Sequence, residues 1–276
     1  MKVAAINDLS GFGKCSLVAD MTVLSAMGIQ CCPIPTAVLS AQTGYPSFYS
    51  KDLTGIIPEY TREWKKQGEI FDGIITGFMM SNEQAKNSLE FIRQFKTKTT
   101  TVLVDPVMGD DGRTYKNFSK DLLHTIREMI RDADIITPNL TELILLAGED
   151  PGNVMKLRGK ELTGEIYRLS MTVGGDLGKT VAVTGIPMEG NGEVGNFILE
   201  KGVSRIITSG SNGIHYSGTG DLFAAAFLGT FISGKSAFDA ADMASRFIYA
   251  SVMDTPADTS PNCGVEYEKN LKMLMA

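Results

Sequence analysis

The sequence predicts an α/β fold with a mainly parallel central sheet, helices on both faces and a few antiparallel edge strands. Short apolar runs alternate with segments whose apolar residues recur at helical spacing, which is the pattern of repeated βα units. Residues 195–200 and 203–208 are two strand-like runs joined by a link too short for a helix, which is typical of an antiparallel pair. No repeat, linker or low-complexity segment interrupts the pattern, so we expect residues 1–276 to form one domain.

The first unit is a strand over 2–6 that ends in Asn7-Asp8, followed by a glycine loop and a helix from Lys14 onward. The stretch 31–39 should be extended, because its two prolines exclude a helix and favour an edge or irregular strand. A polar loop then covers 40–45. This strand–loop–helix opening is typical of folds that bind ligands at the carboxyl ends of their strands.

The middle and end of the chain repeat the alternation. Ser81 and Gln84 are spaced as a capping box for a helix that carries Ala85, Leu89 and Ile92. The other expected elements are strands over 73–78, 101–105, 134–137 and 180–184, a loop over 106–112, a helix with Leu122, Ile126 and Met129 on one face, a helix entered through Asn139, and helices over 158–173, 222–232 and 237–252.

Two glycine motifs suggest nucleotide-binding folds but lack the context that each requires. Gly13-Lys14 resembles part of a P-loop, yet Asp8 stands where that motif needs its first glycine and Cys15 where it needs Ser or Thr. Residues 190–195 fit G-x-G-x-x-G, but a strand follows where a dinucleotide fold needs a helix. We interpret this segment as a hairpin turn, and a dinucleotide oxidoreductase would rest on it alone.

Composition excludes several classes of protein. The chain is 43% hydrophobic and 21% charged, as in ordinary globular proteins, and its net charge is −6. Acidic and basic residues are interspersed, so neither a nucleic acid nor a membrane is expected as a partner. The polar pair at 7–8 comes too early for a signal peptide and no apolar run could span a bilayer, so we expect a cytoplasmic protein.

The four cysteines show no metal-ligand spacing and are expected to be reduced, mostly buried thiols. The two histidines, His124 and His215, are far apart in the sequence and belong to no recognisable triad. A Ser-His-Asp hydrolase is therefore not expected.

The stretch 217–234 is the strongest candidate for a functional site. Gly218 and Gly220 permit a tight turn, and the run 222–232 is apolar on every side, as in a buried helix. The first amides of such a helix have no carbonyl partner and can hold an anion such as a phosphate group. Asp221 lies among them, although a carboxylate there can also serve only as a helix cap.

Other polar residues are expected at the carboxyl ends of the strands, where the functional loops of such folds gather. Hard oxygen ligands in one crevice would suit Mg²⁺, which bridges carboxylates to substrate phosphates. Each residue alone has a simpler role, such as a turn at Asp105, a helix cap at Asn139 and a strand end at Thr184. Together they predict a site, and they are Asn7, Asp8, Thr43, Phe78, Asp105, Asp110, Asn139, Glu142, Thr184 and the Gly218–Asp221 turn.

Five stretches resemble the ribokinase-like superfamily of small-molecule kinases, and within it the pyridoxal (vitamin B6) kinases. Gly218-Thr-Gly-Asp221 is fairly specific for the superfamily, whereas Asp105-Pro-Val-Met-Gly-Asp110 and Thr137-Pro-Asn-Leu-Thr-Glu142 narrow it to the vitamin kinases. Residues 7–13 match as well, and 40–45 match more loosely. The matches follow the family's order from residue 3 to beyond 250, so the resemblance implies a ribokinase-like fold.

The resemblance implies a role for each matched position. Asp221 would take the proton from the primary hydroxyl of the substrate, while the amides of Gly218, Thr219 and Gly220 stabilise the γ-phosphoryl group of ATP in transfer. The implied roles of the others are these: Asp105 and Glu142 organise Mg²⁺, mostly through water, and the nucleotide phosphates, with Asp110 and Asn139 nearby; Thr184 contacts the nucleotide; and Asp8, Ser10, Thr43 and Phe78 belong to the pyridine-ring pocket.

The pocket end departs from the pyridoxal kinase pattern, in which Ser commonly replaces Asp8 and Tyr replaces Phe78. Asp8 instead resembles the aspartate of hydroxymethylpyrimidine kinases, which often carry Cys where Asp221 stands. The resemblance therefore implies phosphorylation of pyridoxal, pyridoxamine or pyridoxine at the 5′-hydroxyl, with a hydroxymethylpyrimidine kinase as the alternative. A hypothesis from a different class of function is that the protein binds a vitamer or a nucleotide without catalytic activity.

The resemblance implies a homodimer, because related kinases are often homodimers, and it leaves open an activating monovalent cation. Residues 40–50 and 109–117 are candidates for a moving cover, because both segments are polar, contain glycine and flank the predicted crevice.

Overall fold

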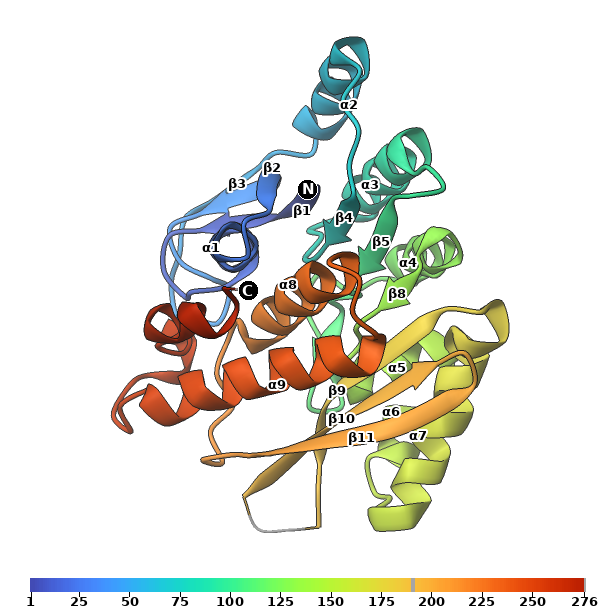
Figure 1. Cartoon of the computed structure of the whole chain (residues 1–276), viewed down its shortest axis with the longest axis vertical. Helices are drawn as coiled ribbons and strands as arrows, with labels where there is room; N and C mark the ends of the chain where they lie inside the picture. Colours follow the sequence, from blue (N-terminus) through green and yellow to red (C-terminus); the bar gives the residue numbers. More distant parts are fainter. Residues whose placement is uncertain (190–191, 276) are drawn as a thin grey trace.

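The computed structural model describes residues 1–189 and 192–275 (Figure 1). In these residues a nine-stranded sheet has the order β11-β10-β9-β8-β5-β4-β1-β2-β3, and a separate hairpin pairs β6 with β7. The strands are β1 (Lys2–Ser10), β2 (Gln30–Leu39), β3 (Ser50–Asp52), β4 (Gly73–Thr76), β5 (Thr101–Val104), β6 (Gly109–Asp110), β7 (Arg113–Thr114), β8 (Ile135–Ile136), β9 (Thr180–Pro187), β10 (Glu193–Glu200) and β11 (Val203–Gly210).

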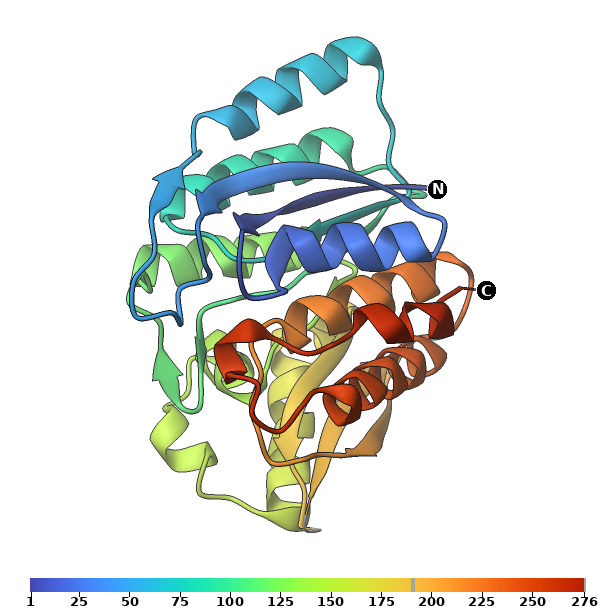
Figure 2. The ribbon, with the colours of Figure 1, turned by 90° about the vertical axis from the view of Figure 1, so that its left-hand side faces the viewer.

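Helices cover both faces of this sheet, as predicted (Figures 1 and 2). Within the described residues, none of the helices is long and apolar enough to cross a membrane. The α-helices are α1 (Ser16–Ala26), α2 (Ile56–Gln67), α3 (Asn82–Phe95), α4 (Lys120–Asp132), α5 (Leu140–Ala147), α6 (Pro151–Val154), α7 (Gly159–Val173), α8 (Thr219–Ile232) and α9 (Ala237–Asp254). Short 3₁₀ turns lie at Gly175–Leu177, Pro261–Cys263 and Glu268–Met273.

The two faces of the sheet belong to two hydrophobic cores. Successive side chains of a strand point to opposite faces, so in β1 Val3 and Ala5 pack with α1, α8 and α9. Ala4 and Ile6 point the other way and pack with α3, α4, α5 and α7. Burial on both faces explains why the parallel strands are almost continuously apolar. It also places the buried helix α8 directly against the strands whose ends carry the candidate residues.

The added strands are antiparallel, as expected from residues 195–208. β10 pairs antiparallel with β9 on one side and with β11 on the other. The turn predicted over 190–195 includes residues 190 and 191, which lie outside the described residues. From Glu193 onward the chain is a strand, so a helix does not follow this glycine segment, as a dinucleotide fold would require.

β2 is the second strand from one edge of the sheet, but the part that contains its prolines is paired on one side only. β3 pairs only with Ala37–Leu39, so the part of β2 that contains Pro33 and Pro35 has β1 on one side and no paired strand of the described residues on the other. Proline has no N–H group to donate to a neighbouring strand. Because no described strand pairs with this part of β2 on that side, no hydrogen bond of the sheet is lost.

Several elements differ from the prediction. β1 continues past residue 6 to Ser10. The register of its pairing with β2 shifts between Asn7 and Leu9, after which Leu9 and Ser10 pair with β2 again. Helix α2, strand β3 and the β6–β7 hairpin, which begins within the expected loop 106–112 and ends just beyond it, were not predicted. The strands expected over 73–78 and 134–137 are shorter, and they end at Thr76 and Ile136.

The capping box predicted for α3 is only half present. The Ser81 hydroxyl accepts from the Gln84 amide at 3.2 Å, but Gln84 Oε1 accepts from the Met80 amide at 2.8 Å instead of from Ser81. The cysteines are free thiols, as predicted. Only Cys15 is buried, however, and the other three are partly exposed, because they lie at the margins of the core and not within it.

Candidate functional site

The start of α8 forms the centre of the candidate site. Gly218 caps the helix with φ +83°, a left-handed conformation that favours glycine, and Asp221 lies in the first turn. A Cβ on Gly218 would come within 2.5 Å of the Lys14 carbonyl oxygen, so the turn packs directly against the β1–α1 loop. A Cβ on Gly220 would meet nothing within 4 Å. Open space therefore lies beside the free amides at the beginning of the helix.

Asn7 links this helix to the ends of two strands. Its Nδ2 donates to Asp221 Oδ1 at 3.0 Å, and its Oδ1 accepts from the amides of Asp8 at 3.0 Å and Phe78 at 2.9 Å. Gly77 permits this approach, because a Cβ there would lie 2.3 Å from Asn7 Nδ2. Three of the predicted residues, Asp8, Phe78 and Asp221, thus meet around a side chain to which the sequence analysis gave no role of its own.

The carboxyl group of Asp221 has the acidity of a useful base. Burial raises its pKa to about 6, and the charge of Asp8 acts in the same direction, while the Ser16 amide and Asn7 lower the pKa. Such a group is mostly ionised at neutral pH, yet it binds a proton more strongly than an ordinary aspartate. These are the requirements for general-base catalysis.

Asp105 and Glu142 form a second buried acidic pair. Asp105 follows β5, and its Oδ1 accepts from the Thr137 hydroxyl at 3.0 Å. Burial first, and then the charge of Asp221, raises its pKa to about 8. Glu142 is 4% exposed, and burial and Asp105 raise its pKa well above its usual range. Two buried carboxylates of this kind oppose each other's ionisation, and a bound cation would favour it.

Glu142 and Asn139 are held by a true capping box at the start of α5. The Asn139 side chain accepts from the Glu142 amide, and Glu142 Oε2 accepts from the Asn139 amide, both at 2.9 Å. The other oxygen, Oε1, accepts from Met108 at 3.0 Å. The simpler role considered for Asn139, a helix cap, is therefore confirmed. The cap also fixes where the Glu142 carboxylate lies.

The remaining nucleotide-side residues lie around this cap. Asn139 Nδ2 donates to the Gly109 carbonyl at 2.8 Å, which ties α5 to the β6–β7 hairpin. Asp110 is exposed on that hairpin. Thr184 lies half-buried in β9, and its backbone forms an isolated parallel β-bridge with that of Asn139. The structure thus brings Thr184 to the same edge as the acidic pair, with Asp110 at the rim.

The residues expected for the ring pocket divide into buried and exposed members. Asp8 is 4% exposed and accepts from the Ser10 hydroxyl at 2.7 Å; its pKa is raised by burial and lowered by Ser10. Thr43 is exposed on a loop, but the adjacent Gln42 donates to the Ser217 hydroxyl at 3.0 Å. Thr43 is therefore carried by a loop that contacts the start of α8.

The donor set fits Mg²⁺ held largely through water. Within the residues that the structure describes, no group of three or more His, Cys, Asp or Glu side chains could hold a metal ion directly. Asp105 and Glu142 are hard oxygen donors, and Mg²⁺ commonly keeps several waters while binding one or two carboxylates and substrate phosphates.

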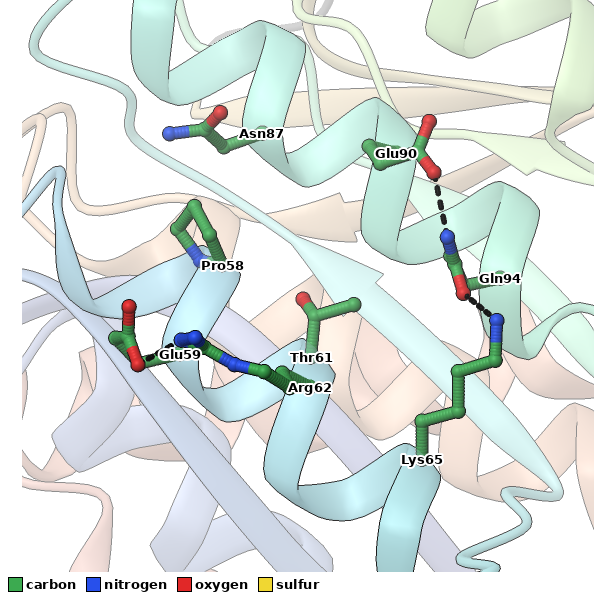
Figure 3. Close-up of a pocket in the computed structure, with 8 residues that line it drawn as sticks. All are labelled: Pro58, Glu59, Thr61, Arg62, Lys65, Asn87, Glu90 and Gln94. Atoms are coloured by element: carbon green, nitrogen blue, oxygen red, sulfur yellow. Dashed lines mark hydrogen bonds and ion pairs between the residues drawn. The ribbon is translucent and has the colours of Figure 1, made fainter.

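Of two cavities lined by described residues, the larger lies away from this site. It has a volume of about 490 Å³ between α2 and α3 (Figure 3), and its charged groups are bonded to other side chains that line it. Arg62 pairs with Glu59, and Lys65 Nζ donates to Gln94, which donates in turn to Glu90. The smaller cavity, of about 260 Å³, includes Ser10, Phe12, Lys14, Tyr45, Cys263 and Tyr267 in its lining. It adjoins the candidate site through Ser10.

Asp20 is a buried polar residue that the sequence analysis missed, and Asn7 was predicted to lie at the site but was given no role of its own. Asp20 lies on α1, is 1% exposed, and its Oδ2 accepts from Asn7 Nδ2 at 3.2 Å. Asn7 had been placed at a strand end, which was a usable signal. The only signal for Asp20 was a charged residue between Ala19 and Met21 within an apolar helix, and its neighbours become visible only in the fold.

Comparisons with known proteins identify the family and agree with the predicted fold. The family model described as phosphomethylpyrimidine kinase matches residues 13–264. A solved structure from Bacteroides thetaiotaomicron, provisionally named a phosphomethylpyrimidine kinase and obtained with pyridoxal, is 36% identical with a TM-score of 0.91, covering 99% of this chain and 95% of that one. The pyridoxal kinase structure from Lactobacillus plantarum is 25% identical with a TM-score of 0.88, covering 99% and 96%.

Curated relatives include the pyridoxal kinase PdxY of Rubrobacter xylanophilus, which is 24% identical over 264 residues, or 92% of this chain and 88% of that protein. The matches to a provisionally named pyridoxal kinase from Schizosaccharomyces pombe and to the pyridoxal kinases from Dictyostelium discoideum and Arabidopsis thaliana span 41%, 45% and 66% of those proteins. The chain thus spans less than two thirds of the length of these three relatives.

Proposed function

We propose that this chain, which belongs to the phosphomethylpyrimidine kinase family, transfers the γ-phosphoryl group of ATP to the 5′-hydroxymethyl group of pyridoxal, pyridoxamine or pyridoxine. The observation that carries the proposal is Asp221, a carboxylate with a pKa of about 6 in the first turn of a helix whose free amides border open space. A base and an anion site thereby adjoin each other, which is what transfer of a phosphoryl group to an alcohol requires.

In the proposed reaction Asp221 accepts the proton of the substrate hydroxyl while the hydroxyl oxygen attacks the γ-phosphorus and ADP departs. The amides of Gly218, Thr219 and Gly220 face the charge on the transferring group. Phosphoryl transfer proceeds through a loose transition state, so the protein contributes mainly positioning and electrostatic stabilisation. Both contributions come from the fixed start of α8, where Asn7 holds the Asp221 carboxylate.

The nucleotide side is proposed to use the acidic pair and the residues around it. Asp105 and Glu142 would hold Mg²⁺ mostly through water, with Asp110 and Asn139 nearby and Thr184 in contact with the nucleotide. When bound, Mg²⁺ neutralises phosphate charge. The two buried carboxyl groups with raised pKa values support this assignment, because they gain most from a cation.

The vitamer is proposed to bind beside Asp8, Ser10, Thr43 and Phe78. A kinase for hydroxymethylpyrimidine or its phosphate is the second candidate, and a specific observation favours it: Asp8 is a buried carboxyl group where a pyridoxal kinase commonly has serine. The Bacteroides relative obtained with pyridoxal supports the first candidate.

The experiment that separates the candidates compares turnover of each vitamer with turnover of hydroxymethylpyrimidine, at fixed ATP and Mg²⁺, by ADP release and product mass. We expect a higher kcat/KM for at least one B6 vitamer. A higher value for hydroxymethylpyrimidine would establish the second candidate. Vitamer binding without any ADP release would instead make the protein a non-catalytic binder.

We further propose that residues 1–276 act as one kinase domain in a cytoplasmic homodimer, and that a monovalent cation stimulates it. The homodimer and the cation come from the resemblance to related kinases, whereas the single domain and the cytoplasmic location come from the sequence pattern. Comparing turnover in potassium, sodium and tetramethylammonium salts at equal ionic strength tests the cation directly.

A further inference from the structure

The side-chain amide of Asn7 has only one orientation that satisfies its neighbours. Its Oδ1 accepts from two backbone N–H groups, those of Asp8 and Phe78, so exchanging the oxygen and the nitrogen would place the Nδ2 donor against these two donors. Nδ2 must therefore point to the opposite side. There its two N–H groups meet two carboxyl groups, Asp221 at 3.0 Å and Asp20 at 3.2 Å.

Asp20 has no role in the proposed chemistry, although a buried carboxyl group is costly to maintain. It lies on the face of α1 that packs against the sheet, 1% exposed, and its Oδ1 has no hydrogen-bond partner among the described residues. Among the residues that the structure describes, the only hydrogen bond of Asp20 is the one from Asn7. Asp20 thus contributes to the site by fixing the side-chain amide of Asn7.

The groups around Asp20 favour its neutral form. Burial most of all, and then Asp221 on α8, Asp105 after β5 and Asp8 on β1, raise its pKa, whereas the hydrogen bond from Asn7 lowers it. Cys31 on β2 is a further acid nearby, and the pKa of its thiol is raised by burial and by Asp20. A neutral carboxyl group can accept from Asn7 without adding negative charge beside the base.

We propose that Asp20 is a positioning residue for phosphoryl transfer, which fixes the orientation of the Asp221 carboxylate through the shared Nδ2 group of Asn7. This inference rests on the proposed kinase function. Because Asn7 holds Oδ1 of Asp221, its position sets the orientation of the carboxylate that is proposed to accept the proton of the substrate hydroxyl. Removing Asp20 leaves one buried N–H of Asn7 without an acceptor, so the amide loses its fixed position between two partners.

Two substitutions at Asp20 separate positioning from simple structural support. Asp20→Asn keeps a neutral side chain with an acceptor oxygen, so we expect kcat within about threefold of the wild type. Asp20→Leu keeps the bulk and removes the acceptor, so we expect kcat to fall by about 10-fold to 100-fold, with KM for both substrates changed less than about threefold. Asp20→Ala, which favours the helix, is the second variant in case the leucine variant does not fold, with the same expected loss.

The pH profile of kcat gives the readout that a structural role would not change. Asn7 lowers the pKa of Asp221, so a loosened amide should move the acid limb of the profile to higher pH in Asp20→Leu but not in Asp20→Asn. The matched control is Thr230→Val at the far end of α8. It removes another buried polar group without a partner in the described residues, and it should change neither kcat nor the limb.

Each result has a distinct meaning. A wild type that phosphorylates neither a B6 vitamer nor hydroxymethylpyrimidine overturns the proposed kinase function and the inference with it. An active wild type with unchanged kcat and acid limb in Asp20→Leu and Asp20→Ala overturns the inference alone. Equal losses in Asp20→Asn and Asp20→Leu also overturn it, because the acceptor would then not be what matters.

Discussion

At the scale of single residues, the electrostatic environment of Asp221 predicts how activity depends on pH. Burial raises its pKa to about 6, so kcat should fall about tenfold for each pH unit below 6 as the base becomes protonated. The charge of Asp8 contributes to this raised pKa. In Asp8→Asn the acid limb should therefore move to lower pH. A limb unchanged in position would show that another group controls it.

The same raised pKa predicts a cost in stability. The folded protein holds a proton on Asp221 up to about pH 6, whereas the unfolded chain releases it near 3.8. The free energy of unfolding therefore falls as pH rises between these values and stays lower above them. Asp221→Asn should gain on the order of 1–3 kcal/mol at pH 8, less at pH 5, and almost nothing below pH 4.

Thermal unfolding without nucleotide or metal, at pH 4, 5 and 8, measures this gain. The control is Asp121→Asn, which also changes an aspartate in the first turn of a helix but at an exposed position. It should show no comparable gain. A loss of stability at pH 8 in Asp221→Asn would contradict the assignment of a costly buried charge.

Sequence reasoning found the residues that carry recognisable chemistry and missed those that act only through contacts. Asp221, Asp105 and Glu142 stand out only together, because each alone could be a cap or a turn, whereas all three lie at strand ends or helix starts within motifs that resemble the kinase family. Asp20 could not be found this way, since its importance depends on Asn7, thirteen positions earlier in the chain. Asp20 and Asn7 come together because α1 packs against β1, and no local sequence pattern encodes this contact.

At the scale of elements, the start of α8 predicts opposite outcomes for two neighbouring glycines. Gly218→Ala forces a side chain into a left-handed conformation and within 2.5 Å of the Lys14 carbonyl, so it should lower both Tm and kcat. Gly220→Ala places a methyl group in open space, so the fold should keep its stability. If the phosphates occupy that space, KM for ATP should rise.

Steady-state kinetics and thermal unfolding of both variants test this contrast. Equal loss of stability in the two variants would mean that the turn, and not the space beside it, determines the effect. An unchanged KM for ATP in Gly220→Ala would place the phosphates elsewhere.

Elements with a strong amphipathic pattern were predicted well, and elements defined by tertiary contacts were not. α4 and α7 follow the spacing of their buried residues, such as Leu122 and Ile126. Strand β3 has three exposed residues, so it has no apolar signal and exists only because β2 offers an edge. The β6–β7 hairpin is likewise held from outside, through Asn139 and Thr141 of the neighbouring cap region.

At the scale of the whole molecule, the sheet order explains why the candidate residues meet. β1, β4, β5, β8 and β9 run parallel, so their carboxyl ends lie at one edge, and the start of α8 reaches this edge from one face of the sheet. The alternation of elements in the sequence predicted this arrangement. The proposed homodimer was not accessible in this way, since it depends on a partner surface.

The homodimer has its own test. Sedimentation equilibrium at micromolar concentration should give twice the mass of one chain, with no dependence on ATP. A single species with the mass of one chain would contradict it.

Asp221 has the central role in the proposed reaction, as the base that activates the vitamer hydroxyl. The most direct measurement is the rate of ADP and phosphorylated product formation from saturating pyridoxal, ATP and Mg²⁺ at pH 8 in the wild type and Asp221→Asn, with pyridoxal affinity measured in both. We predict similar affinity and a rate at least about 10²-fold lower in the variant, within the ~10²–10⁴-fold typical of a lost general base or beyond it. A variant that transfers phosphate as fast as the wild type would contradict the account.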